Sequence, residues 1–166
     1  MKTTGWILGC DPDSEKSGFA LLNCATRTFE YVGTMTFPEA IRFFDSLAAN
    51  DAYSGLYLAI EDSNTATAYN MLDKMNKRAV FAYGRSVGKC HGTYDHLCEC
   101  ADACGINVRP VKPLIKTWKG AKRKISHEEL SSFVSGLPNR TNPEMRDAAL
   151  IAWVTADFPI RISLRK

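Results

Sequence analysis

Residues 6–23, WILGCDPDSEKSGFALLN, contain the clearest strand signals of this chain. A short apolar run, Trp6–Cys10, ends at the turn residues Asp11–Ser14, and a second apolar run follows at Phe19–Asn23. Apolar runs bounded by turn residues are typical of buried strands. Because only a short turn separates them, we expect the two strands to pair antiparallel. The stretch therefore predicts a β-hairpin, with Asp11 where the first strand ends.

Further strands and helices follow in an alternating order. We predict strands at 28–35, 56–60 and 106–110, and helices at 38–50, within 66–104 (breaking near Lys77), from Ser126, and at 142–157. Ser126 and Glu129 have the spacing of a capping box, and Asn142 before Pro143 is typical of a helix start. Strands joined through helices add in parallel. We therefore expect an α/β fold with a mixed five-stranded sheet, three antiparallel strands followed by parallel additions, flanked by helices.

The composition indicates one globular domain spanning residues 1–166. Of the 166 residues, 45% are hydrophobic and 23% are charged, so the chain can bury a core. It contains no apolar run near the roughly 20 residues of a membrane helix, and no signal-peptide pattern. We therefore expect a cytoplasmic protein with no membrane partner, in the host cytoplasm if its source is viral. The six cysteines would then be free thiols in a reducing compartment.

A structural zinc site is the alternative role for the cysteines. His96, Cys100 and Cys104 recur every four residues, but steps of four drift about 40° each around a helix, so these side chains do not converge. The chain also has no CxxC pair, since residues 98–100 read CEC. Buried free cysteines are the favoured interpretation.

Two basic blocks indicate a polyanion partner. From Arg109 to Lys124 the chain has seven Lys or Arg residues and no acid, and from Lys74 to Lys89 it has five and no acid. A solvated basic face is the alternative interpretation. The candidate phosphate-binding residues are Lys74, Lys77, Arg78, Arg85, Lys89, Lys112, Lys116, Lys119, Lys122, Arg123 and Lys124.

Four carboxylates from three segments are predicted to share one site. Asp11 and Glu61 end the first and fourth strands, which finish at the same side of the sheet if they start at the same side. Glu144 and Asp147 are three residues apart at the start of the last helix, so they share one helix face. Hard oxygen ligands at this density suit Mg²⁺ or Mn²⁺, and two ions could clamp a phosphodiester. Taken singly, each acid also fits a structural role in a turn or a first helical turn.

Four motifs resemble those of RuvC-type Holliday junction resolvases. ILGCDPDSEKSGFALLN at 7–23 resembles the family's opening strand, which ends in Asp-Pro-Gly-Ser, and LAIED at 58–62 resembles its second acidic motif. GRSVGKCHG at 84–92 resembles the Gly-rich helix that follows, and NPEMRDAALIAWV at 142–154 resembles the C-terminal helix with two acids three residues apart. The order matches the family across about residues 6–156. The resemblance implies an RNase H-like fold, which has the topology predicted above.

The resemblance also implies a function. It implies a homodimeric endonuclease that resolves four-way (Holliday) DNA junctions by paired symmetric nicks. Asp11, Glu61, Glu144 and Asp147 would hold two Mg²⁺ ions, with Mn²⁺ able to substitute, and Asp11 would bridge them. The basic residues would hold backbone phosphates, which gives salt-dependent affinity and little sequence information.

The chain departs from the family pattern at several positions. Asp13 stands where the family usually has Gly, Asp62 adds a carboxylate after Glu61, and Glu144 stands where Asp or His is more frequent. No residue clearly matches the family's junction-wedging aromatic, for which Tyr69 is the nearest candidate. Strict junction specificity therefore stays open.

Three other functions fit part of the pattern. An RNase H-like nuclease acting on other branched DNA or on RNA–DNA hybrids would use the same acids. A non-catalytic, structure-selective DNA-binding protein is less favoured, because acids facing phosphate weaken binding. An actin-like nucleotide-binding domain also has an acidic turn after its first strand, but those proteins need two such domains.

Several other residues have two interpretations each. Gly84, Gly88 and Gly92 recur every four residues and predict a close backbone approach, either at a dimer interface or on the sheet of the same subunit. Trp118, within the basic block, suits stacking on a substrate or packing. His127, in a first helical turn, suits a structural role better than a catalytic one.

Overall fold

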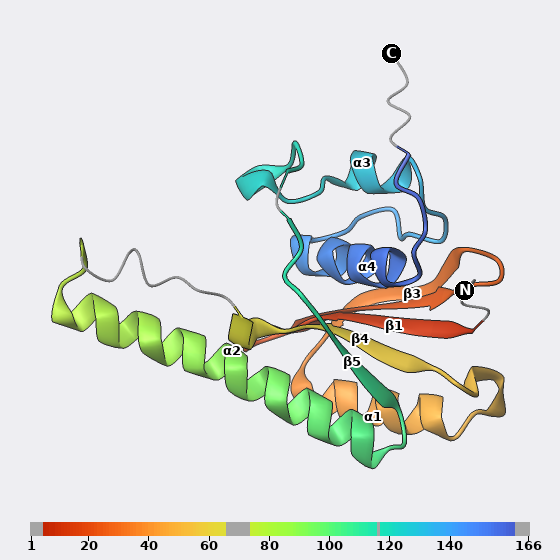
Figure 1. The fold of residues 1–166 in the computed structure, drawn as a ribbon, viewed down its shortest axis with the longest axis horizontal. Coiled ribbons are helices and arrows are strands. Elements are labelled where there is room, and N and C mark those ends of the chain that lie inside the picture. Colours follow the sequence, from red (N-terminus) through yellow and green to blue (C-terminus); the bar gives the residue numbers. More distant parts are fainter. Residues whose placement is uncertain (1–4, 66–73, 116, 162–166) are drawn as a thin grey trace.

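The structure, a computed structural model that describes residues 5–65, 74–115 and 117–161, contains a mixed five-stranded sheet (Figure 1). Its order is β3-β2-β1-β4-β5. The strands are β1 Trp6–Asp11, β2 Ser17–Asn23, β3 Thr28–Met35, β4 Tyr57–Glu61 and β5 Asn107–Val111. The first three pair antiparallel, whereas β4 is parallel to β1 and β5 is parallel to β4. The predicted fold class is confirmed.

Helices cover both faces of the sheet. They are α1 Phe37–Ala48, α2 Lys77–Ala103, α3 His127–Ser131 and α4 Pro143–Thr155, with short 3₁₀ helices at Asp51–Tyr53, Ser63–Thr65 and Ala121–Arg123. Figure 1 shows α1 and α2 on one face, and α4 on the other with α3 beyond it. Within the described ranges, every helix is too short or too polar to span a bilayer.

Alternate strand residues enter two separate cores. In β1, Ile7 packs in the core beneath α4, whereas Leu8 and Cys10 pack in the core beneath α1 and α2. In β4, Ala59 belongs to the α4 side and Ile60 to the other. This period of two determines which face each strand-end residue occupies.

Most predicted helix boundaries are confirmed by their caps. The break expected near Lys77 is the start of α2, where the Asn76 side chain accepts a hydrogen bond of 2.9 Å from the Ala79 N–H. One strand boundary is wrong, because β5 runs through Pro110 to Val111 instead of ending at Pro110. Since β5 is an edge strand, a proline without an N–H is tolerated there.

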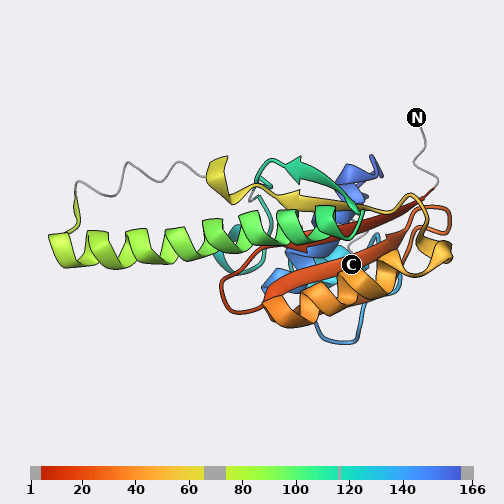
Figure 2. The same ribbon diagram turned by 90° about the horizontal axis from the view of Figure 1, so that it is seen from below.

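Helix α2 extends far beyond the sheet. It has 27 residues, and its first half projects away from the other elements (Figures 1 and 2). Apart from the adjacent residues and backbone of α2 itself, a Cβ atom at Gly84, Gly88 or Gly92 would meet no described atom within 4 Å. The alternative that these glycines pack on the sheet of the same subunit is therefore wrong for the described residues.

The six cysteines all lie in the described ranges and are free thiols. Cys10 and Cys24 are buried, and the other four are partly buried. Burial raises the pKa of Cys24 to about 11, so its thiol stays protonated at neutral pH. His96, which was considered as a zinc ligand, has its Nδ1 atom 3.4 Å from Glu99 Oε2.

Candidate active site

Two acids lie side by side where β1 and β4 end. The strands are parallel with Cys10 opposite Ile60, so the next residues along, Asp11 and Glu61, are neighbours. Cys10 and Ile60 face the α1–α2 core, and alternation therefore places both acids on the face covered by α4.

Two glycines let helix α4 lie directly on this face. A Cβ atom at Gly9 would come within 2.1 Å of the Ala148 carbonyl oxygen, and one at Gly18 within 2.1 Å of the Glu144 carbonyl oxygen. Any side chain at these positions would push the helix away. The close approach brings the start of α4, which carries Glu144 and Asp147, to the end of β1.

Three of the four predicted acids share one pocket. Asp11, Glu61 and Asp147 line a pocket of about 180 Å³. The other lining residues are Leu114, Ile115, Trp118, Lys124, Ile125 and Leu150. Glu144 instead borders a neighbouring hollow beside Asp13. The structure therefore brings three acids together and places the fourth to one side.

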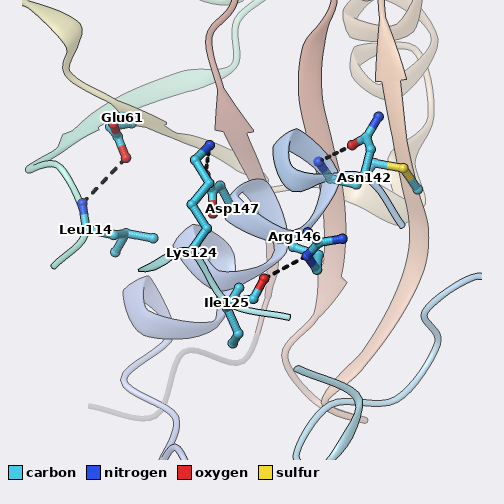
Figure 3. Close-up of polar contacts among 8 residues, drawn as sticks. Glu61, Leu114, Lys124, Ile125, Asn142, Arg146 and Asp147 are labelled. Carbon is cyan, nitrogen blue, oxygen red and sulfur yellow. Dashed lines mark hydrogen bonds and ion pairs between the residues drawn. The ribbon is translucent and has the colours of Figure 1, made fainter. Parts of the chain in front are cut away.

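The segment between β5 and α3 contacts two of these acids. Lys124 Nζ lies 2.5 Å from Asp147 Oδ2, and the Leu114 N–H donates a hydrogen bond of 3.5 Å to Glu61 Oε2 (Figure 3). We predicted Lys124 only as a phosphate-binding residue, and the sequence carried no signal for this ion pair.

Burial and mutual repulsion perturb the acid at the centre of the site. Burial, followed by repulsion from Asp147 and Glu61, raises the pKa of Asp11 to about 8, although the positive charge of Lys124 opposes the rise. Burial lowers the pKa of Lys124, but the hydrogen bond and attraction from Asp147 outweigh it, so the net pKa is raised. Among the described residues that line the pocket, the three acids therefore outnumber the one cation, Lys124.

A hydrogen-bond network fixes the backbone next to Lys124. Arg146 donates from Nε to the Ile125 carbonyl oxygen at 2.7 Å and from Nη1 to the Thr141 carbonyl oxygen at 2.6 Å. The His127 ring contacts the Thr141 hydroxyl at 2.9 Å, which is a structural role. Sequence reasoning overlooked Arg146, although it lies inside the motif that contains the two acids of α4.

A buried acid anchors the middle of the same segment. Glu129 is 4% exposed, and its carboxylate accepts hydrogen bonds from the Ser126 N–H at 2.9 Å and the Lys119 N–H at 3.1 Å. The capping box with Ser126 was predicted, whereas the bond to Lys119 was not. Trp118 is partly buried against the α4-side core and also lines the acidic pocket.

The predicted basic residues fall into two groups. Lys74, Lys77, Arg78, Arg85 and Lys89 are exposed at the start and along the outer half of α2, and Lys112, Lys119, Lys122 and Arg123 are exposed between β5 and α3. Lys124 is partly buried in the acidic pocket. Lys116 and the candidate aromatic Tyr69 lie outside the described residues.

The α2 group lies beside the turn that leads from β1 to β2. Arg78, Arg85 and Lys89 line a groove together with Ser14 and Glu15 of that turn. The same two turn residues border the hollow that contains Glu144. The basic face of α2 therefore lies at the same edge of the sheet as the acids.

The acids have the chemistry to bind a divalent cation, but their carboxylates do not converge on a single metal position. Their oxygens are the ligands that Mg²⁺ prefers, and a cation between them would relieve the repulsion on Asp11. Among the described residues, however, no three His, Cys, Asp or Glu side chains are arranged to hold a single metal ion. Asp147 is instead paired with Lys124.

Comparisons with known proteins identify the fold. No family model and no curated protein sequence matches this chain. Thermus thermophilus RuvC, solved in complex with a Holliday junction substrate, is similar at 13% identity and a TM-score of 0.53, over 89% of this chain and 90% of that one. A second structure of T. thermophilus RuvC gives 12% identity and a TM-score of 0.51, over 89% and 90% of the two chains. The large terminase nuclease of thermophilic phage G20c gives 13% and 0.44, over 90% and 81%. The chain therefore has an RNase H-like fold similar to that of RuvC.

Proposed function

We propose that this chain is a divalent-metal-dependent endonuclease that cuts branched DNA, with four-way junctions as its substrate. The observation that carries the proposal is the partly buried Asp11, which lies with Asp147 and Glu61 in a pocket bordered by a basic segment. Among the described residues that line this pocket, Lys124 is the one cation. A protein that only binds DNA gains nothing from acids that repel phosphate. Acids that hold metal ions explain both the excess negative charge and the basic surroundings.

The four acids would hold the metal ions, and the neighbouring basic residues would hold the substrate. Asp11, Glu61, Glu144 and Asp147 would hold two Mg²⁺ ions, with Mn²⁺ able to substitute. When bound, these ions supply activation of water and neutralisation of phosphate charge. In the overall hydrolysis, water adds to phosphorus and the bond to the 3′ oxygen breaks, which leaves a 3′-hydroxyl and a 5′-phosphate.

The choice of substrate rests on the two basic groups and on the fold. The basic face of α2 and the described residues between β5 and α3 belong to different elements near the acids, so both could contact DNA backbones that meet at a branch. The similar RuvC structure holds a Holliday junction substrate, which supports testing four-way junctions first.

A homodimer would place two such sites on one junction. Val80 and Val87 on the projecting half of α2 continue the seven-residue spacing of Tyr94 and Ala101, which pack in the core. A seven-residue apolar repeat favours helix pairing, and a second copy of the chain is the partner we propose. Sedimentation equilibrium at micromolar concentration should give a dimer for wild type and a monomer for Val87→Glu. A monomeric wild type would refute this part of the proposal.

Cleavage assays on defined nucleic acids test the activity. We would incubate the protein with a synthetic four-way junction, a linear duplex and an RNA–DNA hybrid, each with Mg²⁺, with Mn²⁺ and with EDTA. Paired symmetric nicks in the junction that require the metal and are lost in Asp11→Asn would support the proposal. Glu30→Gln, at an exposed position of β3, is the matched carboxylate control.

Other outcomes would assign the alternatives. Cutting of the hybrid alone would indicate a hybrid-specific nuclease of the same fold. Junction binding without cutting, in Mg²⁺ and Mn²⁺ alike, would refute the enzyme and indicate a structure-selective DNA-binding protein.

A further inference from the structure

Lys124 is the single cation among the described residues that line the acidic pocket. Its ammonium group contacts Asp147 Oδ2 at 2.5 Å, and the two side chains are only 23% and 16% exposed. An ion pair this sheltered from water is screened much less than one on the surface.

The backbone beside Lys124 holds the ammonium group in this position. Ile125, the next residue, is fully buried, and its carbonyl oxygen accepts the 2.7 Å hydrogen bond from Arg146. Arg146 and Asp147 are adjacent in α4, so the same turn of helix fixes the lysine backbone and receives its side chain. Helix α4 therefore fixes both the backbone next to Lys124 and the ammonium group at the end of its side chain.

We propose that Lys124 is a stand-in cation, whose ammonium group pairs with the Asp147 carboxylate until a divalent metal ion displaces it. The displaced ammonium group is then free to bind a substrate phosphate. This inference rests on the proposed function. An ammonium group and a divalent ion on the same carboxylate would repel each other, so one must leave. The ion pair between Lys124 and Asp147 also explains why the described acids share a pocket but are not arranged to hold a single metal ion.

The exchange would couple metal binding to DNA binding. A phosphate that attracts Lys124 makes Asp147 available, so DNA strengthens metal binding, and by linkage the metal strengthens DNA binding. Lys124 would act as a positioning residue in this exchange, and its removal should affect metal affinity in the absence of any DNA.

Metal titration of a lysine variant tests whether Lys124 competes with metal for Asp147. We expect Lys124→Met to bind Mn²⁺ roughly tenfold more tightly than wild type, measured without DNA by electron paramagnetic resonance of free Mn²⁺. Arg42→Met removes an exposed cation of α1 that is not among the proposed DNA-binding residues, and its Mn²⁺ affinity should equal that of wild type. Equal affinities of Lys124→Met and wild type would overturn the inference.

Lysine labelling of wild type tests both the displacement of Lys124 by metal and its contact with a substrate phosphate. Acylation requires an accessible, neutral amine, so Lys124 should react slowly in EDTA, severalfold faster with Ca²⁺, and slowly again with Ca²⁺ plus a four-way junction. Peptide mass spectrometry reads each lysine separately, and Lys2, which is not among the proposed phosphate-binding residues, reports general changes in reactivity. An unchanged Lys124 rate on addition of a bound metal would overturn the displacement. A rate that stays high with the junction would overturn the phosphate contact.

The two proposals fail in distinguishable ways. If wild type binds no divalent metal and cuts no DNA, the nuclease proposal fails and the stand-in cation fails with it. If wild type binds metal and cuts junctions while Lys124→Met shows unchanged Mn²⁺ affinity, only the stand-in cation is refuted.

Discussion

Replacing Asp11 with asparagine tests the electrostatics of the site without any substrate. In the folded protein burial, followed by repulsion from Asp147 and Glu61, raises the pKa of Asp11 from 3.8 to about 8. The folded state therefore retains a proton that the unfolded chain releases between about pH 4 and pH 8. Because the folded state binds this proton more tightly, the metal-free protein should lose stability as pH rises through that window. Asp11→Asn cannot titrate and should escape the loss.

The size of the effect follows from the same pKa. The interval from 3.8 to about 8, at about 1.4 kcal/mol per pH unit, sets an upper limit of about 6 kcal/mol. Buried carboxylates relax and admit water, which reduces the penalty. We therefore expect Asp11→Asn to gain about 2 kcal/mol of unfolding free energy over wild type between pH 5 and pH 8.

Urea unfolding in EDTA at pH 5, 6.5 and 8 measures this difference. Glu30→Gln is the control, and its difference from wild type should stay constant over the same range. Adding about 10 mM Mg²⁺ should make wild type the more stable of the two proteins at pH 8, because metal stabilises wild type more than Asp11→Asn. A difference between Asp11→Asn and wild type that is independent of pH in EDTA would refute the proposed electrostatics of the pocket.

Three further predictions concern the surroundings of the acids. Gly18→Ala should lose about 1–3 kcal/mol in thermal or urea unfolding, because its Cβ atom would come within 2.1 Å of the Glu144 carbonyl oxygen. Gly88→Ala, which meets open space, should not be destabilised in the same assay. Arg146→Leu should cost about 2 kcal/mol in urea unfolding, because two carbonyl oxygens lose their donor, and retention of full stability would contradict the network. Neutralising Arg85 and Lys89 together with glutamine should reduce the slope of log affinity against log salt by about 1.5–2 in fluorescence anisotropy on a junction, and an unchanged slope would exclude them from the DNA contact.

Elements whose signals are local can be predicted from the amino-acid sequence. Alternating apolar residues and turn residues predicted the hairpin from Trp6 to Asn23, and capping residues predicted where α3 and α4 begin. The strand ends also placed Asp11 and Glu61 at one edge of the sheet, because parallel neighbours end together. These features depend on residues within a few positions of one another or on general rules of sheet topology.

The partners of the acids, in contrast, depend on contacts between distant segments of the chain. The ion pair between Lys124 and Asp147 and the hydrogen bond from the Leu114 N–H to Glu61 join segments far apart in the chain. The stretch that supplies both donors has no strand or helix periodicity, so nothing in its sequence indicates which charge faces the pocket. The separation of Glu144 into a neighbouring hollow likewise depends on how closely α4 lies on Gly9 and Gly18. Such contacts arise from the packing of whole elements, which a pattern along the chain does not encode.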